Sequence, residues 1–154
     1  METTNQKSID VLNNLLEINN DRIDGYNRAS KETDENDFKN LFAQFAGTSS
    51  KCKQELTAEV KKLGGVPVEG TRTTGKLYRA WMDVKAALAN KDPKVILKSC
   101  ESGEDVALKN YEDALKNITL ESNHYPVIYN QYVLIRAEHD KINNLRDLLV
   151  TVGV

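Results

Sequence analysis

The chain has 154 residues, of which 40% are hydrophobic and 29% charged, and its formal net charge is −2. A chain of this length buries roughly two-thirds of its unfolded surface as one domain, and its small net charge creates no field that attracts nucleic acid or an anionic membrane. Its two cysteines, Cys52 and Cys100, are too few for a secreted disulfide framework. The first residues lack the apolar core of a signal peptide, and apolar residues never run for the length of a membrane span. We therefore expect one cytoplasmic domain over residues 1–154.

Two amphipathic helices are predicted in the N-terminal part of the chain. Apolar residues recur at helical spacing from residue 8 to about residue 31, and again from Phe38 to Leu63. A short polar break at residues 33–37 separates the two segments. Gly64 and the residues after it end the second segment, as a left-handed C-cap would. The short break predicts an antiparallel helical hairpin.

Residues 64–92 are predicted to form a long crossover. The stretch 65–75 is rich in glycine and threonine and contains Pro67, so it is unsuited to a helix interior. It is followed by an amphipathic helix from Lys76 to about Ala89, which rises roughly 21 Å. Loop and short helix together can span the length of a helical bundle.

The C-terminal part predicts a second hairpin. Asp92-Pro93 supplies a helix N-cap and first position for a helix that continues to about residue 117. After a turn at residues 117–126, apolar residues from Val127 to Leu149 indicate a last helix. His124, in the turn, is expected to be solvated. Since no segment has the alternation of a strand, the predicted fold class is all-α, with two antiparallel hairpins joined by the crossover.

A carboxylate interrupts the apolar stripe of the helix that follows Pro93. Steps of three and four residues place Glu104 on the same helix face as large apolar side chains. An acid in such a place needs partners when it is buried. The stripe contains Leu97, Cys100, Glu104, either Ala107 or Leu108, Tyr111 and Leu115.

Several segments resemble the ferritin-like superfamily of four-helix bundles. Residues 104–111 are similar to its third helix, Leu63 to Pro67 to the exit from its second, and residues 137–142 to its fourth. The chain is most similar to a small bacterial branch classed as a domain of unknown function. The segments that carry this likeness are Asp21 to Tyr26, with Arg22 in place of a glycine, Leu63 to Pro67, Trp81 to Leu88, and Gly103-Glu104-Asp105. This resemblance implies a ferritin-like bundle and supplies no activity.

The resemblance also implies where a di-iron site would lie. Di-iron members take a glutamate from each of two helices and a Glu-x-x-His pair from each of the other two. At the corresponding positions this chain has Asn19 in the first helix, Ser49 and Cys52 in the second, Glu104 in the third, and Arg136 with His139 in the fourth. One carboxylate cannot balance two divalent ions, and an arginine adds a positive charge.

We therefore expect a non-enzymatic bundle without a cofactor, with a structural or protein-interaction role. In this hypothesis Glu104 pairs with Arg136 or accepts a hydrogen bond from His139. Its buried polar layer consists of Asn19, Ser49, Cys52, Glu104, Arg136 and His139.

The sequence leaves one alternative open, a degenerate metal-binding or redox protein. Glu104, His139 and Cys52 are ligand types that suit one divalent metal such as zinc, and Cys52 and Cys100 could form a redox pair if their helices adjoin. The expected partner is a second copy of the chain, in a homo-oligomer such as a dimer that associates through an outer helix face.

Overall fold

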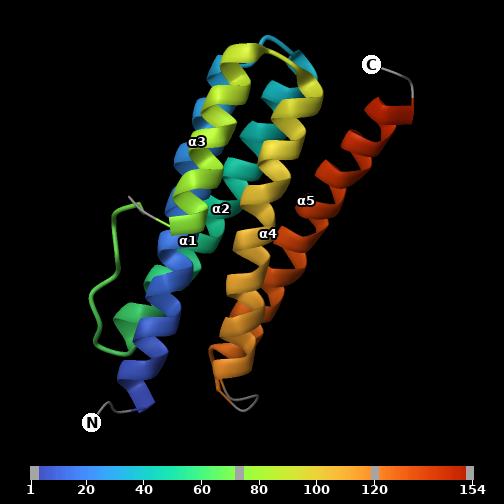
Figure 1. The fold of residues 1–154 in the computed structure, drawn as a ribbon. Helices are drawn as coiled ribbons and strands as arrows, with labels where there is room; N and C mark the ends of the chain where they lie inside the picture. Colours follow the sequence, from blue (N-terminus) through green and yellow to red (C-terminus); the bar gives the residue numbers. More distant parts are fainter. Residues whose placement is uncertain (1–3, 72–74, 119–121, 152–154) are drawn as a thin grey trace.

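Five helices make up the chain in a computed structural model that describes residues 4–71, 75–118 and 122–151. They are α1 (Thr4–Glu32), α2 (Asn36–Lys62), α3 (Gly75–Asn90), α4 (Pro93–Asn117) and α5 (Tyr125–Thr151), as Figure 1 shows. The described ranges contain no strand, which confirms the all-α prediction. None of the helices described is both long and apolar enough to cross a membrane.

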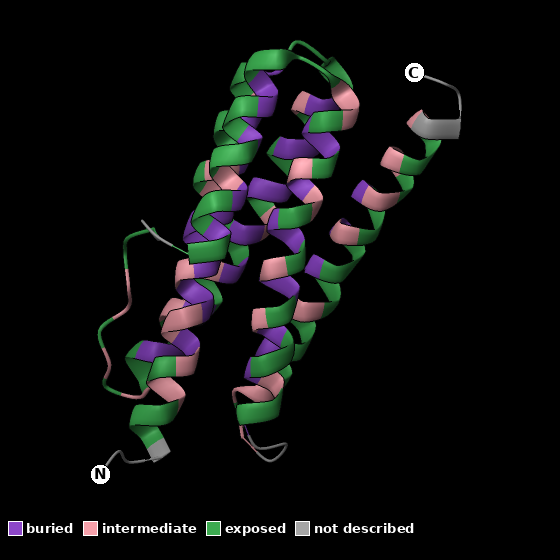
Figure 2. Cartoon of the chain, viewed as in Figure 1, coloured by how far each residue is buried: buried purple, intermediate pink, exposed green. Residues whose placement is uncertain are grey.

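Two apolar clusters fill the interior, one toward each end of the bundle. Figure 2 shows the buried residues as bands that follow the inner faces of the helices. The lower cluster, at the end of the bundle where the N-terminus lies in Figure 1, includes Leu12, Leu16, Leu56, Val60, Leu77, Leu108, Tyr111, Ile128 and Ile135. The upper cluster includes Tyr26, Phe38, Phe42, Phe45, Val84, Leu88, Leu97, Cys100 and Ile142.

The direction of each helix follows from which cluster contains its first buried residues and which contains its last. α1, α3 and α5 run from the lower to the upper cluster, whereas α2 and α4 run the opposite way. α1 and α2 therefore form one antiparallel hairpin, and α4 and α5 form a second. Because α2 and α4 have the same direction, the chain between them must travel the length of the bundle. α3 makes most of that journey and packs on α1 and α4.

Two side chains of α1 hold the loop that precedes α3. The Asn13 amide group donates to the carbonyl of Val66 at 3.1 Å and accepts from the backbone N–H of Val68 at 3.0 Å. About two helical turns further on, Asn20 donates to the carbonyl of Gly70 at 3.0 Å. These bonds satisfy backbone groups that lie outside regular structure.

The predicted helix ends are confirmed at two places. Gly64 follows α2 with a φ of +80°, the left-handed conformation that a glycine adopts without strain. Before α4, the Asp92 side chain accepts a hydrogen bond from the backbone N–H of Lys94 at 3.0 Å, and Pro93 is the first helical residue.

α3 is seated on α1 where α1 has no side chain. A Cβ atom built on Gly25 would lie 2.4 Å from Cε3 of Trp81, so the indole occupies the space that any larger residue would need. Tyr26, the next residue, meets the same indole edge to face with ring centroids 4.9 Å apart. The pair Gly25-Tyr26 and the lone tryptophan thus fix the position of α3 on the bundle.

Candidate functional site in the buried polar layer

Polar side chains form a layer between the two apolar clusters. α1 supplies Asn19 and Arg22, α2 supplies Ser49, α4 supplies Glu104, and α5 contributes as well. All these residues lie on the inner stripes of their helices, so the step of three or four residues that buries the apolar clusters also buries them. The buried polar residues from α5 are Gln131 and Glu138.

Arg22 is the centre of the layer. Its guanidinium is 1% exposed, and Nη2 donates to Oε1 of Glu104 at 2.7 Å and to Oε1 of Glu138 at 2.8 Å. Nη1 donates to the Ser49 hydroxyl. Although burial lowers the pKa of Arg22, the charges of Glu104 and Glu138 hold it above its ordinary value. One side chain of α1 is therefore joined to α2, α4 and α5.

Glu104 is the most enclosed acid of the layer. The hydroxyl of Tyr26 donates to the same oxygen, Oε1, that Arg22 contacts. Burial, and then the charge of Glu104, raise the pKa of Tyr26, so its phenol stays a donor. The Tyr26 ring also faces the guanidinium, with Cζ of Arg22 5.2 Å from the ring centroid.

Glu138 is held by both charge and hydrogen bonding. The Thr48 hydroxyl donates to its Oε2 at 2.6 Å, while Oε1 accepts from Arg22. Burial raises the pKa of Glu138, and the positive charge of Arg22 with the hydrogen bonds from Arg22 and Thr48 only partly offsets that effect. The layer contains two carboxyl groups for one guanidinium, so a proton on Glu138 would relieve its excess negative charge.

A second, neutral limb extends the layer toward the lower cluster. Asn19 donates to the Tyr111 hydroxyl at 2.8 Å, and Tyr111 donates to Oε1 of Gln131 at 2.7 Å. Gln131 in turn donates to the carbonyl of Cys52 at 3.3 Å and to Glu55 at 3.0 Å. Burial raises the pKa of Tyr111 well above its ordinary value. This limb links α1, α4, α5 and α2 without an ion pair.

Four of the six residues predicted for the layer are buried, namely Asn19, Ser49, Cys52 and Glu104.

The other two predicted members, Arg136 and His139, lie outside the layer. Arg136 is exposed and donates to the Tyr132 hydroxyl at 2.9 Å. His139 is on the side of α5 that faces Asp105, 2.6 Å from Nε2. Although burial lowers it, the hydrogen bonds with Asp105 and Asp140 hold the pKa of His139 above its ordinary value. The prediction that Glu104 pairs with Arg136 or His139 is wrong, since the inner stripe of α5 passes through Gln131, Ile135, Glu138 and Ile142.

Arg22 and Glu138, the two residues that replace them, were missed for different reasons. Arg22 stands three residues after Asn19 and four before Tyr26, a spacing that places it on the inner face of α1. In the family resemblance Arg22 appears only as a replacement for a glycine, which does not indicate a place in the layer. Glu138 stands directly before His139, and a helix turns by about 100° per residue, so alignment on the histidine selected the wrong face.

The two cysteines are both buried and free. Burial raises the pKa of Cys52 to about 12 and raises the pKa of Cys100 further. Both thiols are therefore protonated at neutral pH, a state in which they are poor nucleophiles and poor metal ligands. Both thiols are free, so the structure does not show the redox pair that the alternative would need.

The layer does not fit a di-iron centre. In such a centre carboxylates bridge cations, whereas here the cation between Glu104 and Glu138 is the guanidinium of Arg22. Within the described ranges, no group of three His, Cys, Asp or Glu side chains is arranged to hold a metal ion, so Glu104, His139 and Cys52 are not gathered into one site.

Comparison with protein families identifies a match over most of the chain. Residues 7–117, which include α2, α3, α4 and nearly all of α1, match the family model described as domain of unknown function (DUF2383). Comparison with curated proteins finds no match. α5, which supplies Gln131 and Glu138 to the layer, lies beyond the matched residues. Because the match covers well over half of the chain, this protein belongs to the DUF2383 family.

Proposed function

We propose that this protein is a non-enzymatic, ferritin-like helical bundle with a structural or protein-interaction role. The observation that carries the proposal is the ion network at the centre of the bundle, in which Arg22 lies between Glu104 and Glu138. These charged groups are paired with one another and are at most 10% exposed as side chains. No substrate can reach them without opening the bundle.

The direction of the helices supports the ferritin-like part of the proposal. Two antiparallel hairpins, with a crossover between α2 and α4, distinguish ferritin-like bundles from bundles in which all connections are short. The parallel course of α2 and α4 agrees with that topology. Connectivity alone does not supply an activity.

Metal analysis tests the non-enzymatic role. The protein is expressed with iron, manganese and zinc in the medium, purified without chelator, and analysed by mass spectrometry of the elements. We expect far less than one metal ion per chain, because the fixed charge of Arg22 repels cations from the two carboxylates. Near-stoichiometric metal that is lost in Glu104→Gln but kept in Glu112→Gln, an exposed change on the same helix, would show that the proposal is wrong.

An exposed apolar stripe on α5 supports self-association. Tyr129 and Val133 are four residues apart and are 49% and 48% exposed, and the adjacent Leu134 is 42% exposed. Side chains at this spacing lie on one side of a helix, and contiguous exposed apolar residues mark interaction surfaces. A second copy of the chain, presenting the same stripe, could cover it in a symmetric dimer.

Sedimentation velocity tests the dimer. We expect a concentration-dependent dimer that Val133→Glu converts to a monomer, because the change places a charge in the interface. Val66→Glu is the matched control, since Val66 is 83% exposed and lies in the loop before α3. A monomer at all concentrations, or equal effects of the two variants, would contradict self-association through this stripe.

A further inference from the structure

A groove lies between α2, α4 and the last turns of α5. In Figure 1 the C-terminal end of α5 stands away from the other helices. The groove has a volume of about 600 Å³, which is within the range of small-molecule sites. None of its lining residues belongs to the buried polar layer or to the exposed stripe of α5. Its lining includes Glu35, Asp37, Phe38, Asn40, Leu41, Gln44, Pro93, Leu97, Lys141, Leu145, Leu148 and Leu149.

The floor of the groove is apolar. Leu145 and Leu149 pack against the upper cluster, to which Phe38, Leu41 and Leu97 belong. Leu148 lines the groove as well and is 57% exposed. Burying such side chains under an apolar ligand is favourable in proportion to the area removed from water.

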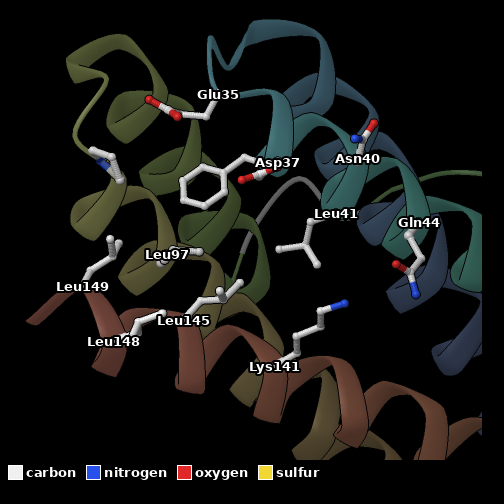
Figure 3. A pocket seen from close by; sticks show the side chains of 12 residues that line it. Glu35, Asp37, Asn40, Leu41, Gln44, Leu97, Lys141, Leu145, Leu148 and Leu149 are labelled. Carbon is white, nitrogen blue, oxygen red and sulfur yellow. The ribbon is translucent and has the colours of Figure 1, made fainter. Parts of the chain in front are cut away.

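The polar groups of the groove are divided by charge. Figure 3 shows Lys141 of α5 reaching toward α2 on the side where Gln44 lies, whereas Glu35 and Asp37 lie at the far end. No carboxylate in the part of the chain that the structure describes forms an ion pair with Lys141. An anionic group is therefore attracted to the Lys141 end and repelled from the Glu35 end.

The dimensions favour a slender occupant. The lining residues of α5 span positions 141–149, a length of about 12 Å along a helix. A volume of about 600 Å³ is that of a site for one small molecule. Among the lining residues Lys141 is the one cation, and it stands at one end of the apolar floor. One alkyl chain with a charged head matches both features.

We propose that this groove binds an amphiphile with one alkyl chain and a carboxylate head. The head lies at Lys141, within reach of the amide of Gln44, and the chain lies on Leu145, Leu149 and Leu97. This binding activity goes beyond the structural role proposed above and does not depend on it.

Isothermal titration calorimetry of the full chain with three ten-carbon probes tests the proposal. The probes are decanoate, 1-decanol and decyltrimethylammonium, each below its micelle concentration. We expect saturable binding of one decanoate per chain, weaker binding of the neutral alcohol, and the weakest binding of the cation. Absence of saturable decanoate binding, or equal affinity for decanoate and the cation, would overturn the proposal.

Two variants separate the head from the tail. Lys141→Gln should weaken decanoate binding about twofold to fivefold, as expected for an exposed ion pair, and leave the alcohol unchanged. Leu148→Gln should weaken both ligands. Val95→Gln is the control for folding and exposure, since Val95 is 41% exposed on α4 and lies outside the groove.

The same variants distinguish the other occupant of such a groove, a second copy of the chain. If decanoate fails to bind and Leu148→Gln alone converts a dimer to a monomer in sedimentation velocity, the groove is an interface between copies and the amphiphile proposal is wrong.

Discussion

Arg22 decides the character of the bundle interior. A buried guanidinium is costly unless charge and hydrogen bonds compensate it. Here two carboxylates and a serine hydroxyl do so, and a tyrosine ring covers its face. A buried network of paired charges need not stabilise the fold more than well-packed apolar side chains would. Removal of one charged partner alone, however, leaves an unpaired buried charge.

Replacing Arg22 with methionine should therefore be strongly destabilising. Arg22→Met leaves Glu104 and Glu138 without a cation, and we expect a loss of about 3–5 kcal/mol in the free energy of unfolding. Urea denaturation followed by circular dichroism measures this. Arg136→Met is the control, because Arg136 is exposed and bonded only to Tyr132 among the described side chains. Equal midpoints for the two variants would contradict the central place of Arg22.

Glu138 should make stability depend on pH. Its pKa is raised in the folded state, so between the ordinary value of about 4.5 and the raised value the native protein holds a proton that the unfolded chain has lost. Stability from this group is then complete below that window and falls as the pH rises through it. Glu138→Gln should remove this fall, since glutamine does not ionise.

The measurement is the free energy of unfolding of parent and Glu138→Gln from pH 4 to about pH 8. The difference should shift in favour of the variant as the pH rises. The groups that face Glu138 are Arg22, Thr48 and Glu104, and none of them is altered. Glu112→Gln, an exposed change, should show no such trend. A constant difference at all pH values would refute the raised pKa.

The packing of α3 on α1 depends on one close contact. The contact of Gly25 with Trp81 allows α1 and α3 to approach closely, and no side chain could be added there without moving the indole. α3 also completes the crossover that allows α2 and α4 to run in the same direction. The position of α3 within this connection thus depends on the absence of a side chain at Gly25.

Gly25→Ala should separate this packing effect from helix propensity. Alanine is the better helix former by about 1 kcal/mol, but crowding against Trp81 costs about 1–3 kcal/mol. We expect a net loss of stability and a shift in the emission of Trp81, the only tryptophan in the chain. Gly47→Ala in α2, whose added Cβ would meet nothing within 4 Å, should instead raise stability. Stabilisation by both changes would contradict the proposed seat.

The helices themselves could be predicted from the sequence, but which residues of α5 point into the bundle could be predicted only in part. Periodicity predicts α5 to within a few residues, yet Val133, an apolar residue of that pattern, is 48% exposed. Gln131 and Glu138 interrupt the apolar stripe on the inner face of α5. A search for apolar residues at helical spacing does not identify buried polar residues that form hydrogen bonds with their neighbours. His124 likewise was expected to be solvated but lies 2.7 Å from Glu59, with 12% of its side chain exposed.

At the scale of the molecule, the fold could be predicted because local signals agree with one another. Gly64, Asp92 and Pro93 mark helix ends, and the long connection between residues 63 and 92 fixes the topology. The composition of the buried layer could be predicted only in part. Which of several charged residues meets Glu104 depends on the rotation of α1 and α5 about their axes, and a one-residue error changes the partner.

Both cysteines should report opening of the whole bundle. Cys52 lies beside the polar layer and Cys100 within the upper cluster, and both are 0% exposed. Iodoacetamide should modify neither thiol in the native protein and both in concentrated urea, with rates in intermediate urea that follow global unfolding. Mass spectrometry after quenching measures this. Rapid labelling of one thiol under native conditions would show that its part of the bundle opens separately.

The ion network also divides its charges between the two hairpins. Arg22 belongs to the hairpin of α1 and α2, while Glu104 and Glu138 belong to the hairpin of α4 and α5. Either hairpin formed alone would have to leave its charges in water, and could not close its apolar surface over them. Water therefore leaves the polar layer when the two hairpins dock on each other.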